Sequence, residues 1–202
     1  MPPGGSPVPA SQGGGLRWRE TMHGELTIDS VVKKAAFRIT IAVPDIPAFI
    51  ADPSHPGGVT GSVVVEGLTP SSGSQIEGGS FHLFVEATDP QERLMVYSLP
   101  FHAPDGRKRV LSGLKHVRGH RILDFWRSTT TLRAKLEESG ETPVPVGELE
   151  LGVWDVVKLL ISMRGTRGGR WSTAFVAYWR FVHFYSSTIL RLYIDGRKEQ
   201  RK

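Results

Sequence analysis

The sequence predicts a mainly β protein: an antiparallel β-sandwich of roughly eight to ten strands followed by two C-terminal α-helices. Three observations carry this prediction. Short segments with alternating apolar and polar residues recur through most of the chain, and Gly, Pro and Asp residues separate them. After Gly147 the alternation gives way to helical periodicity. Repeated short strands with turns between them are typical of a sandwich or barrel, and we expect the sandwich.

The ordered domain is expected to begin close to Trp18. Residues 1–15 are mostly Pro, Gly and Ser with almost no large apolar side chain, so they cannot bury enough surface to offset the entropy of ordering. We expect a disordered tail there and a single sandwich domain with its helices over residues 16–202. Residues 35–43 alternate between two sets of side chains and predict the clearest strand, which Pro44 ends.

A hairpin is expected around the turn Pro104-Asp105-Gly106. Asp suits the capping of its own turn and Gly accepts a positive φ, so residues 95–101 and 108–115 should pair. The other strands expected in this part of the chain are residues 59–68, 75–78, 80–86 and 93–101. The proline-punctuated residues 45–56 are expected to form a short helical turn or loop on the sheet edge.

A further strand is predicted after the hairpin. Thr130, Leu132, Ala134 and Leu136 fall on one side of it, and Thr129, Thr131, Arg133 and Lys135 fall on the other. This alternation predicts one buried face and one solvated face, as in an antiparallel sheet. Residues 148–151 are expected to form the last short strand.

Two helices are predicted at the C-terminus. The apolar residues Val153, Val156, Val157, Leu160 and Ile161 recur at the spacing of an amphipathic helix. Residues 164–170, rich in Gly and Arg, end that helix. A second helical segment, apolar nearly all round, follows over residues 172–194.

The composition limits the classes of function. No cysteine is present, which removes disulfides and thiolate chemistry and favours a reducing cytoplasm. The start has neither the basic region nor the apolar run of a secretory signal, so we expect a cytoplasmic protein. The net charge of +5 is moderate and no nucleic-acid-binding motif accompanies it, so we expect no nucleic-acid partner.

A series of short motifs resembles a known family. These motifs are Gly79-Ser-Phe-His-Leu-Phe, Met95-x-Tyr, Asp105-Gly-Arg, Leu111-x-Gly-x-Lys, Asp124-x-Trp, Thr129-Thr-Thr-Leu and Gly147-Glu-Leu-Glu-Leu. From Trp18 to Tyr193 the chain is similar to the accessory domain that accompanies cholesterol-oxidase-like GMC flavin oxidoreductases and their fused α/β-hydrolase relatives. The resemblance implies no catalytic residue, because it is to the partner of the flavin domain. Neither a dinucleotide-binding Gly-x-Gly-x-x-Gly after a first strand nor a hydrolase Gly-x-Ser-x-Gly is present.

The seven histidines raise the question of a metal or acid–base site. His116 and His120 are four residues apart, but they are expected in a loop after a strand with no Glu between them, so a solvent-facing turn is favoured. His82 alternates with Phe81 and Leu83, and a surface position or one on the second sheet face is favoured for it. We therefore expect neither a metal nor a cofactor such as flavin.

The densest polar and aromatic cluster consists of Asp124, Trp126, Thr129 and Thr131. One interpretation is a ligand pocket lined by the indole and the hydroxyls. The favoured interpretation is structural: Trp126 anchors the core, Asp124 caps a turn, and the threonines suit a strand. Both interpretations are open at this point.

The second helix is the strongest lead toward function. Its predicted ligand or partner surface consists of Phe175, Tyr178, Trp179, Phe181, Phe184 and Tyr185. Arg180, His183 and Arg191 interrupt the helix and argue against its crossing a membrane, because a central arginine is costly in hydrocarbon. The alternatives are a helix lying on an anionic membrane surface and a helix buried against the sandwich or against a partner protein.

The sequence therefore predicts a non-catalytic binding module, related to lipid- or sterol-type oxidoreductase systems. It would contact a membrane surface, or an oxidoreductase or hydrolase partner, through the aromatic helix. Formation of an oligomer is a further alternative. The alternative is an enzyme acting on a hydrophobic small molecule in a pocket inside the sandwich. A large interior pocket with a polar pair would favour the enzyme, whereas a filled core and an exposed aromatic face would favour the module.

Overall fold

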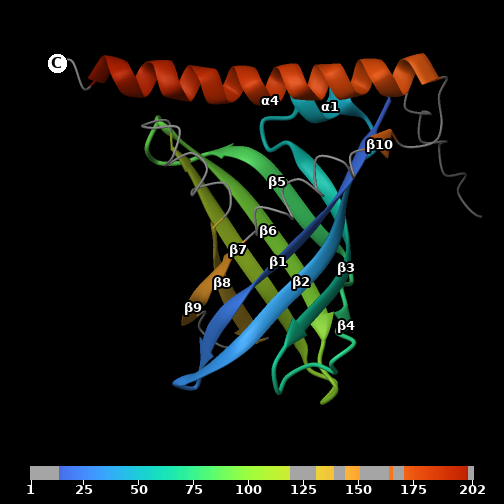
Figure 1. Cartoon of the computed structure of the whole chain (residues 1–202), viewed down its shortest axis with the longest axis vertical. Coiled ribbons are helices and arrows are strands. Elements are labelled where there is room, and N and C mark those ends of the chain that lie inside the picture. The colour runs from blue at the N-terminus through green and yellow to red at the C-terminus, as the bar shows by residue number, and fades with distance from the viewer. Residues whose placement is uncertain (1–13, 119–130, 139–143, 151–163, 166–170, 200–202) are drawn as a thin grey trace, which may run out of the picture.

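The strands of this chain close into an antiparallel barrel, and one long helix lies across an end of it (Figure 1). The computed structural model describes residues 14–118, 131–138, 144–150, 164–165 and 171–199. Eight strands among these residues form the barrel wall: β1 (Leu16–Ile28), β2 (Val31–Val43), β3 (Pro56–Val65), β5 (Gly79–Glu86), β6 (Glu92–His102), β7 (Lys108–Arg118), β8 (Thr131–Glu138) and β9 (Val144–Glu150).

The strands pair in the order in which they occur along the chain. Each barrel strand pairs antiparallel with the next, and β9 returns to pair with β1. Two short strands lie outside this ring: β4 (Ser74–Gln75) pairs with β3, and β10 (Arg164–Gly165) pairs with β1. The barrel is therefore a single meander that closes on itself.

The prediction of a β-sandwich is wrong, because β1 pairs on both of its edges. It pairs with β2 along its whole length and with β9 over four positions. A side chain at Gly24 would meet the carbonyl oxygen of Glu148 at 2.2 Å. At Gly147, whose φ is 155°, a side chain would meet the carbonyl oxygen of Glu25 at 2.1 Å. Glycine on each side of the seam thus lets the first and last barrel strands approach and close the sheet.

The predicted hairpin is confirmed. Residues 95–101 of β6 pair with residues of the 108–115 segment of β7. At the turn, Gly106 has a φ of 77°, and the carboxylate of Asp105 accepts a hydrogen bond from the backbone amide of Arg107 at 3.0 Å. The Asp and Gly residues that predicted the hairpin therefore form its turn in the structure.

Two other predicted strands are also confirmed. Residues 35–43 lie in β2, where Phe37 and Ile39 are buried in the barrel. In β8, Leu132 and Ala134 are buried, while Arg133 and Lys135 are exposed, as the alternation predicts. Period-two patterning therefore located these strands and their inner faces.

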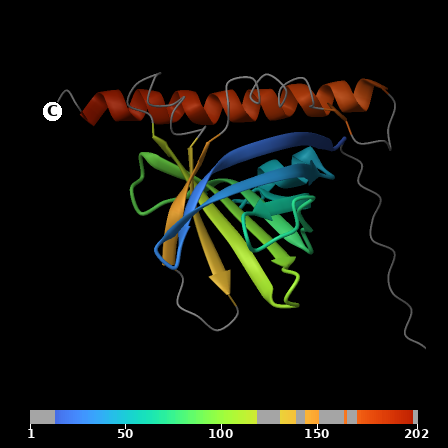
Figure 2. The ribbon, with the colours of Figure 1, turned by 60° about the horizontal axis from the view of Figure 1, so that its bottom comes forward.

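Two helices of the described chain lie together at one end of the barrel. The short helix α1 (Ile46–Ala51) follows β2, and the carboxylate of Asp45 caps it by accepting a hydrogen bond from a backbone amide of the first turn at 2.9 Å. The long helix α4 (Trp171–Glu199) runs across this end and contacts α1 (Figure 2). The helix predicted over residues 172–194 is thus confirmed, whereas the one predicted over residues 153–161 lies outside the described residues.

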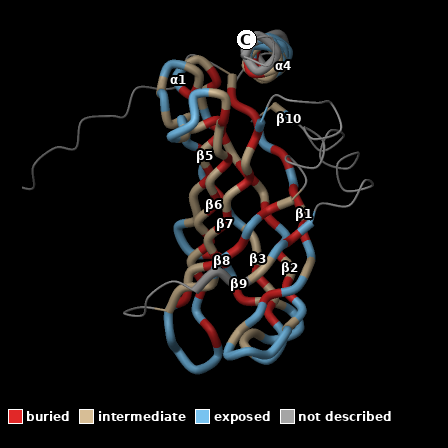
Figure 3. Tube along the Cα trace, turned by 90° about the vertical axis from the view of Figure 1, so that its left-hand side faces the viewer, coloured by how far each residue is buried: buried red, intermediate tan, exposed pale blue. Residues whose placement is uncertain are grey.

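Large apolar side chains are buried in the barrel. Buried residues alternate with half-buried or exposed ones along its strands (Figure 3). This alternation is typical of barrel strands whose every second side chain points inward. The largest fully buried side chains include Tyr97, Phe37, Phe101, Met22, Leu99 and Leu111. At the end opposite α4, the guanidinium of Arg109 is 7% exposed and pairs with Asp105 at 2.8 Å and with Glu138 at 3.2 Å. Aromatic packing therefore covers one end of the barrel, and ion pairs cover the other.

Candidate functional site

The helix α4 presents one face to the barrel. On this side Ala177, Phe181 and Leu192 are buried. The Phe181 ring centroid lies 5.6 Å from that of Trp18 in β1 and 6.2 Å from that of Phe49 in α1. These contacts dock the helix on the barrel end, because buried aromatic pairs combine a large apolar area with favourable ring geometry.

A backbone irregularity in β5 supports the same interface. The pairing of β5 with β6 shifts between His82 and Val85, and Phe84 has a φ of 54°, a left-handed conformation that is costly for a residue other than glycine. The Phe84 ring centroid lies 5.1 Å from that of Tyr185 and 6.1 Å from that of Phe184. Aromatic packing under α4 therefore offsets the backbone strain.

The solvent face of α4 contains two apolar patches, which the exposed polar residues His183 and Ser186 separate. Phe175 is 64% exposed, Leu190 is 57% exposed and Trp179 is 54% exposed, and Val176 and Ile194 are exposed as well. At 3.6 residues per turn these five positions fall on the side of the helix opposite Phe181. Several large exposed apolar side chains on one side of a helix are typical of a contact surface. We call these five residues the outer face.

The structure divides the predicted aromatic surface between the two sides of α4. Phe175, Tyr178 and Trp179 are exposed, Phe181 is buried against the barrel, and Phe184 and Tyr185 are half-buried there. Sequence reasoning missed Leu190 and Ile194, which extend the outer face about four turns beyond Trp179. Their helical spacing from Trp179 is the signal that could have found them.

Most of the predicted pocket lies outside the described residues. This is the case for Asp124, Trp126 and Thr129, whereas Thr131 is the half-buried first residue of β8. The two interpretations of this cluster, ligand pocket and core anchor, therefore both stay predictions.

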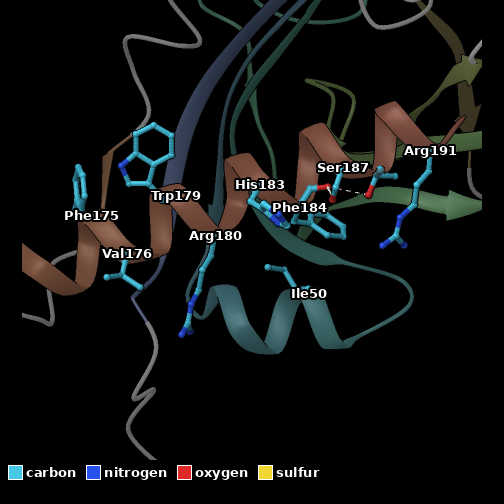
Figure 4. Close-up of a pocket in the computed structure, with 10 residues that line it drawn as sticks. Ile50, Phe175, Val176, Trp179, Arg180, His183, Phe184, Ser187 and Arg191 are labelled. Carbon is cyan, nitrogen blue, oxygen red and sulfur yellow. Dashed lines mark hydrogen bonds between the residues drawn. The ribbon is translucent and has the colours of Figure 1, made fainter. Parts of the chain in front are cut away.

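A groove runs along the flank of α4 beside α1 (Figure 4). Its volume is about 730 Å³, and Ile50 of α1 lines it together with residues of α4. Arg180 and Arg191 point to the same side of α4, one on either side of Ile50. Neither guanidinium forms an ion pair with any residue that the structure describes. The groove therefore combines an apolar lining with cationic groups that no described residue neutralises.

A buried polar cluster lies inside the barrel. The ammonium of Lys115 donates to the carboxylate of Glu20 at 2.5 Å, and each of the two side chains is 3% exposed. The hydroxyl of Tyr97 donates to the same carboxylate at 3.1 Å, and the ammonium lies 5.0 Å from the centroid of the Tyr97 ring. Glu20 is thus satisfied by a cation and by a neutral donor together.

Sequence reasoning missed this cluster, although the alternation contains a signal for it. Glu20 occupies the inward phase of β1 between Trp18 and Met22, and Lys115 occupies the inward phase of β7. A charged residue at an apolar phase of a strand must find a partner inside the fold. Which partner it finds depends on the closure of the barrel.

Two tyrosines near Glu20 stay protonated. Burial raises the pKa of Tyr97 well above its usual range, and the charge of Glu20 raises it further. Burial also raises the pKa of Tyr185 on α4, again with a contribution from Glu20. Both phenols are therefore protonated at neutral pH, and Tyr97 donates its proton in the hydrogen bond to Glu20.

The expected loop position of His116 is wrong. This residue lies within β7, because β7 continues to Arg118, and its Nδ1 lies 2.6 Å from the carboxylate of Glu92. Burial raises the pKa of Glu92, but hydrogen bonds from Arg118 and His116 outweigh burial, and the net pKa is below its ordinary value of 4.5. The carboxylate is therefore held ionised on the outside of the barrel wall.

The other histidines singled out in the sequence form no metal site within the described chain. The ring of His82 lies with Nδ1 3.1 Å from the carbonyl oxygen of Ser54, and His120 lies outside the described residues. In the parts of the chain that the structure describes, His, Asp and Glu side chains form no group of three suited to a metal ion.

Within the described residues, no helix combines the length and the apolar character that crossing a membrane requires. Comparisons with protein-family models, with curated proteins and with solved structures find no match for this chain. The function must therefore be argued from the geometry of α4 and of the barrel.

Proposed function

We propose that this protein is a non-catalytic module that binds anionic membrane surfaces through the outer face of α4. The observation that carries the proposal is the two-sided helix: one apolar face docks on the barrel while a second, which includes Trp179 and Leu190, stays exposed. A helix that places aromatic and aliphatic residues beside arginines suits the boundary between lipid head groups and acyl chains. The barrel then acts as the support that holds this helix at the surface.

The charge distribution supports a lipid surface over a protein partner. Residues 164–202 contain nine Lys or Arg residues and two Asp or Glu residues. Residues 1–163 contain sixteen Lys or Arg residues and eighteen Asp or Glu residues. The excess positive charge therefore belongs to the segment that contains α4. Each basic residue close to an anionic membrane contributes about 1 kcal/mol of attraction.

The buried charges of the barrel favour a binding module over an enzyme with an interior pocket. Glu20 and Lys115 are each 3% exposed and are paired with one another, so each already has a partner within the fold. Buried, paired charges beside an exposed aromatic face are the combination expected of a module that binds through its surface.

The resemblance to an accessory domain of sterol-type oxidoreductases supports a role for such binding. In that role the module would hold an oxidoreductase or hydrolase partner close to the lipid that the partner acts on. The protein would then be peripheral to the membrane, and the catalytic groups would belong to the partner.

Co-sedimentation with vesicles tests the proposal. The protein should sediment with vesicles that contain phosphatidylglycerol and much less with phosphatidylcholine alone, and the bound fraction should fall as salt rises. The double variant Leu190→Ala/Ile194→Ala should lose most of this binding, because it shortens the outer face without changing charge. The matched control is Val31→Ala/Val32→Ala, which removes exposed apolar side chains at 55% and 60% exposure from the other end of the barrel.

Two results would contradict the proposal. A salt-insensitive complex with an enzyme or with a second copy, abolished by the same double variant, would assign the outer face to a protein partner. A monodisperse monomer that ignores anionic vesicles would show that the exposed apolar residues serve no membrane contact.

A further inference from the structure

We propose that the groove between α1 and α4 binds a single anionic amphiphile, with Arg180 at its phosphate or carboxylate head group and the apolar lining along its chain. The inference rests on the proposed function, since it names the class of lipid that the module would recognise. It also goes further, because it assigns a site for one molecule rather than a contact with a surface.

The lining of the groove is suited to an apolar chain. Ile50 projects from α1 toward α4, and Val176 and Phe184 line the groove on the α4 side (Figure 4). Arg180 and Arg191 are eleven residues apart on the helix, which is roughly 16 Å along its axis. The groove therefore has the length of several turns, enough for a medium acyl or alkyl chain to lie beside α4.

The polar groups of the groove select an anion. The hydroxyl of Ser187 donates to the carbonyl oxygen of Phe184 at 3.0 Å, and the hydroxyl of Thr188 donates to the same oxygen at 2.9 Å. These neutral donors are therefore already used within the helix. The donors left for a ligand are the side chains of Trp179, Arg180, His183 and Arg191. Two of these four are cationic, and none of the described residues lining the groove is acidic.

Arg180 rather than Arg191 is assigned to the head group. Arg191 also lines a second groove, of about 300 Å³, on the barrel side of α4, where Glu86 and Arg93 lie. Arg180 lines the main groove, where no described residue is acidic, whereas Arg191 is shared with the second groove, whose lining includes the Glu86 carboxylate 3.9 Å from Arg93. A guanidinium binds phosphate and carboxylate oxygens through paired, charge-assisted hydrogen bonds.

Titration calorimetry with decyl phosphate, below its micelle concentration, tests this site on the full-length protein. Saturable binding of one molecule per chain is expected. Decanoate distinguishes a carboxylate from a phosphate head group, inorganic phosphate reports the head group without a chain, and decyl glucoside is the neutral control with the same chain. Decyl phosphate or decanoate should bind about tenfold or more tightly than decyl glucoside, in line with loss of one charged contact.

Variants separate the two parts of the site. Arg180→Gln should weaken decyl phosphate binding about tenfold, whereas Arg38→Gln, which removes an exposed arginine from β2, should leave it unchanged. Ser187→Trp should block the groove without altering charge. Circular dichroism melts of each variant show whether a loss of binding reflects unfolding.

The outcome is distinguishable from that of the membrane proposal. Leu190→Ala/Ile194→Ala lies outside the groove lining, so it should lose vesicle binding and keep decyl phosphate binding. Ser187→Trp should do the reverse. Equal binding of decyl glucoside and decyl phosphate, an unchanged affinity in Arg180→Gln, or no saturable binding of either anion would overturn the amphiphile site, whatever the vesicle result.

Discussion

The charged side chains of the barrel and those of α4 are placed in opposite ways. In the barrel, Lys115 pairs with Glu20 in the interior, and Arg109 pairs with Asp105 at the turn end. On α4, Arg180 is exposed and forms no ion pair with a residue that the structure describes. The same chain therefore contains arginines and lysines of two kinds, distinguished by burial and by pairing.

The physical reason for the difference is desolvation. A charge that leaves water without a partner costs several kcal/mol, so each buried charge of the barrel requires a counter-charge in the fold. An exposed guanidinium has no such requirement and remains available to an anion from outside. The paired charges inside the barrel therefore stabilise the fold, whereas the exposed arginines of α4 are accessible to solvent and to ions.

The largest effect is expected for Lys115→Met, which removes one partner of the interior pair. Glu20 would remain buried with only the Tyr97 hydroxyl as a donor, and the free energy of unfolding should fall by about 3–5 kcal/mol. Urea denaturation measures this change. The double variant Glu20→Leu/Lys115→Met should recover much of the loss, because it leaves no unpaired charge. A single variant as stable as the parent would show that the pair does not hold the barrel.

The next effect separates the two faces of α4. Phe181→Ala should lower the free energy of unfolding by about 3 kcal/mol, because the buried ring packs on Trp18 and Phe49. Trp179→Ala, on the outer face, should change stability by less than about 0.5 kcal/mol and reduce vesicle binding instead. Thermal melts and co-sedimentation of both variants provide the test. Equal destabilisation by the two variants would contradict the division into a docking face and an outer face.

A smaller effect is expected when single arginines of the barrel and of α4 are replaced. Arg109→Gln should lower the free energy of unfolding by about 1–3 kcal/mol, because the guanidinium is 7% exposed and bonded to Asp105 and Glu138. Arg180→Gln should leave it unchanged within about 0.5 kcal/mol. Urea denaturation measures both changes in the free energy of unfolding, and the transition midpoints can be compared directly where the dependence of that free energy on urea is the same. The comparison fails if Arg180→Gln is the more destabilising of the two.

The smallest effect concerns pH. The folded-state pKa of Glu92 is below its ordinary value of 4.5, so the stability that this carboxylate contributes is complete above about pH 4.5 and is lost as the pH falls through the lower folded-state pKa. Glu92→Gln should therefore be less stable than the parent at pH 6, and the gap should close under acid conditions. Melting temperatures across this range measure the gap. Glu148→Gln, which removes an exposed partner 3.8 Å from Arg133, serves as the control and should show a small gap throughout.

Local structure in this chain was predictable because it depends on neighbours in sequence. The Pro104-Asp105-Gly106 turn identified the β6–β7 hairpin, and the alternation around Leu132 identified the inner side of β8. The late helix was also predictable, since its apolar residues repeat with helical spacing over many turns. It was also predictable that some aromatic residues of α4 would not face the barrel, because they are too many for one docking face.

The assignment of those aromatic residues to faces was not predictable. Phe181 and Trp179 are two residues apart in sequence and look alike by composition, yet one is 4% exposed and the other 54%. Which of them faces the barrel depends on how α4 is oriented on Trp18 and Phe49. That orientation is a tertiary contact, and helical periodicity alone leaves it undetermined.

The sequence by itself determined most of the strands, the main turn, the long helix and the mainly β class, because alternation, turn chemistry and helical spacing act over a few residues. It did not identify β1 as a strand. Only the tertiary structure decided that the sheet is a barrel, because a sandwich and a barrel have the same alternation and differ in whether β1 meets β9. Glycines at positions 24 and 147 permit that meeting. Closure also brings Lys115 to Glu20, 95 residues earlier, and turns two charged residues on separate strands into a buried pair. Long-range contacts decided these features because the partner of a buried group is set by the closed fold rather than by its neighbours in sequence.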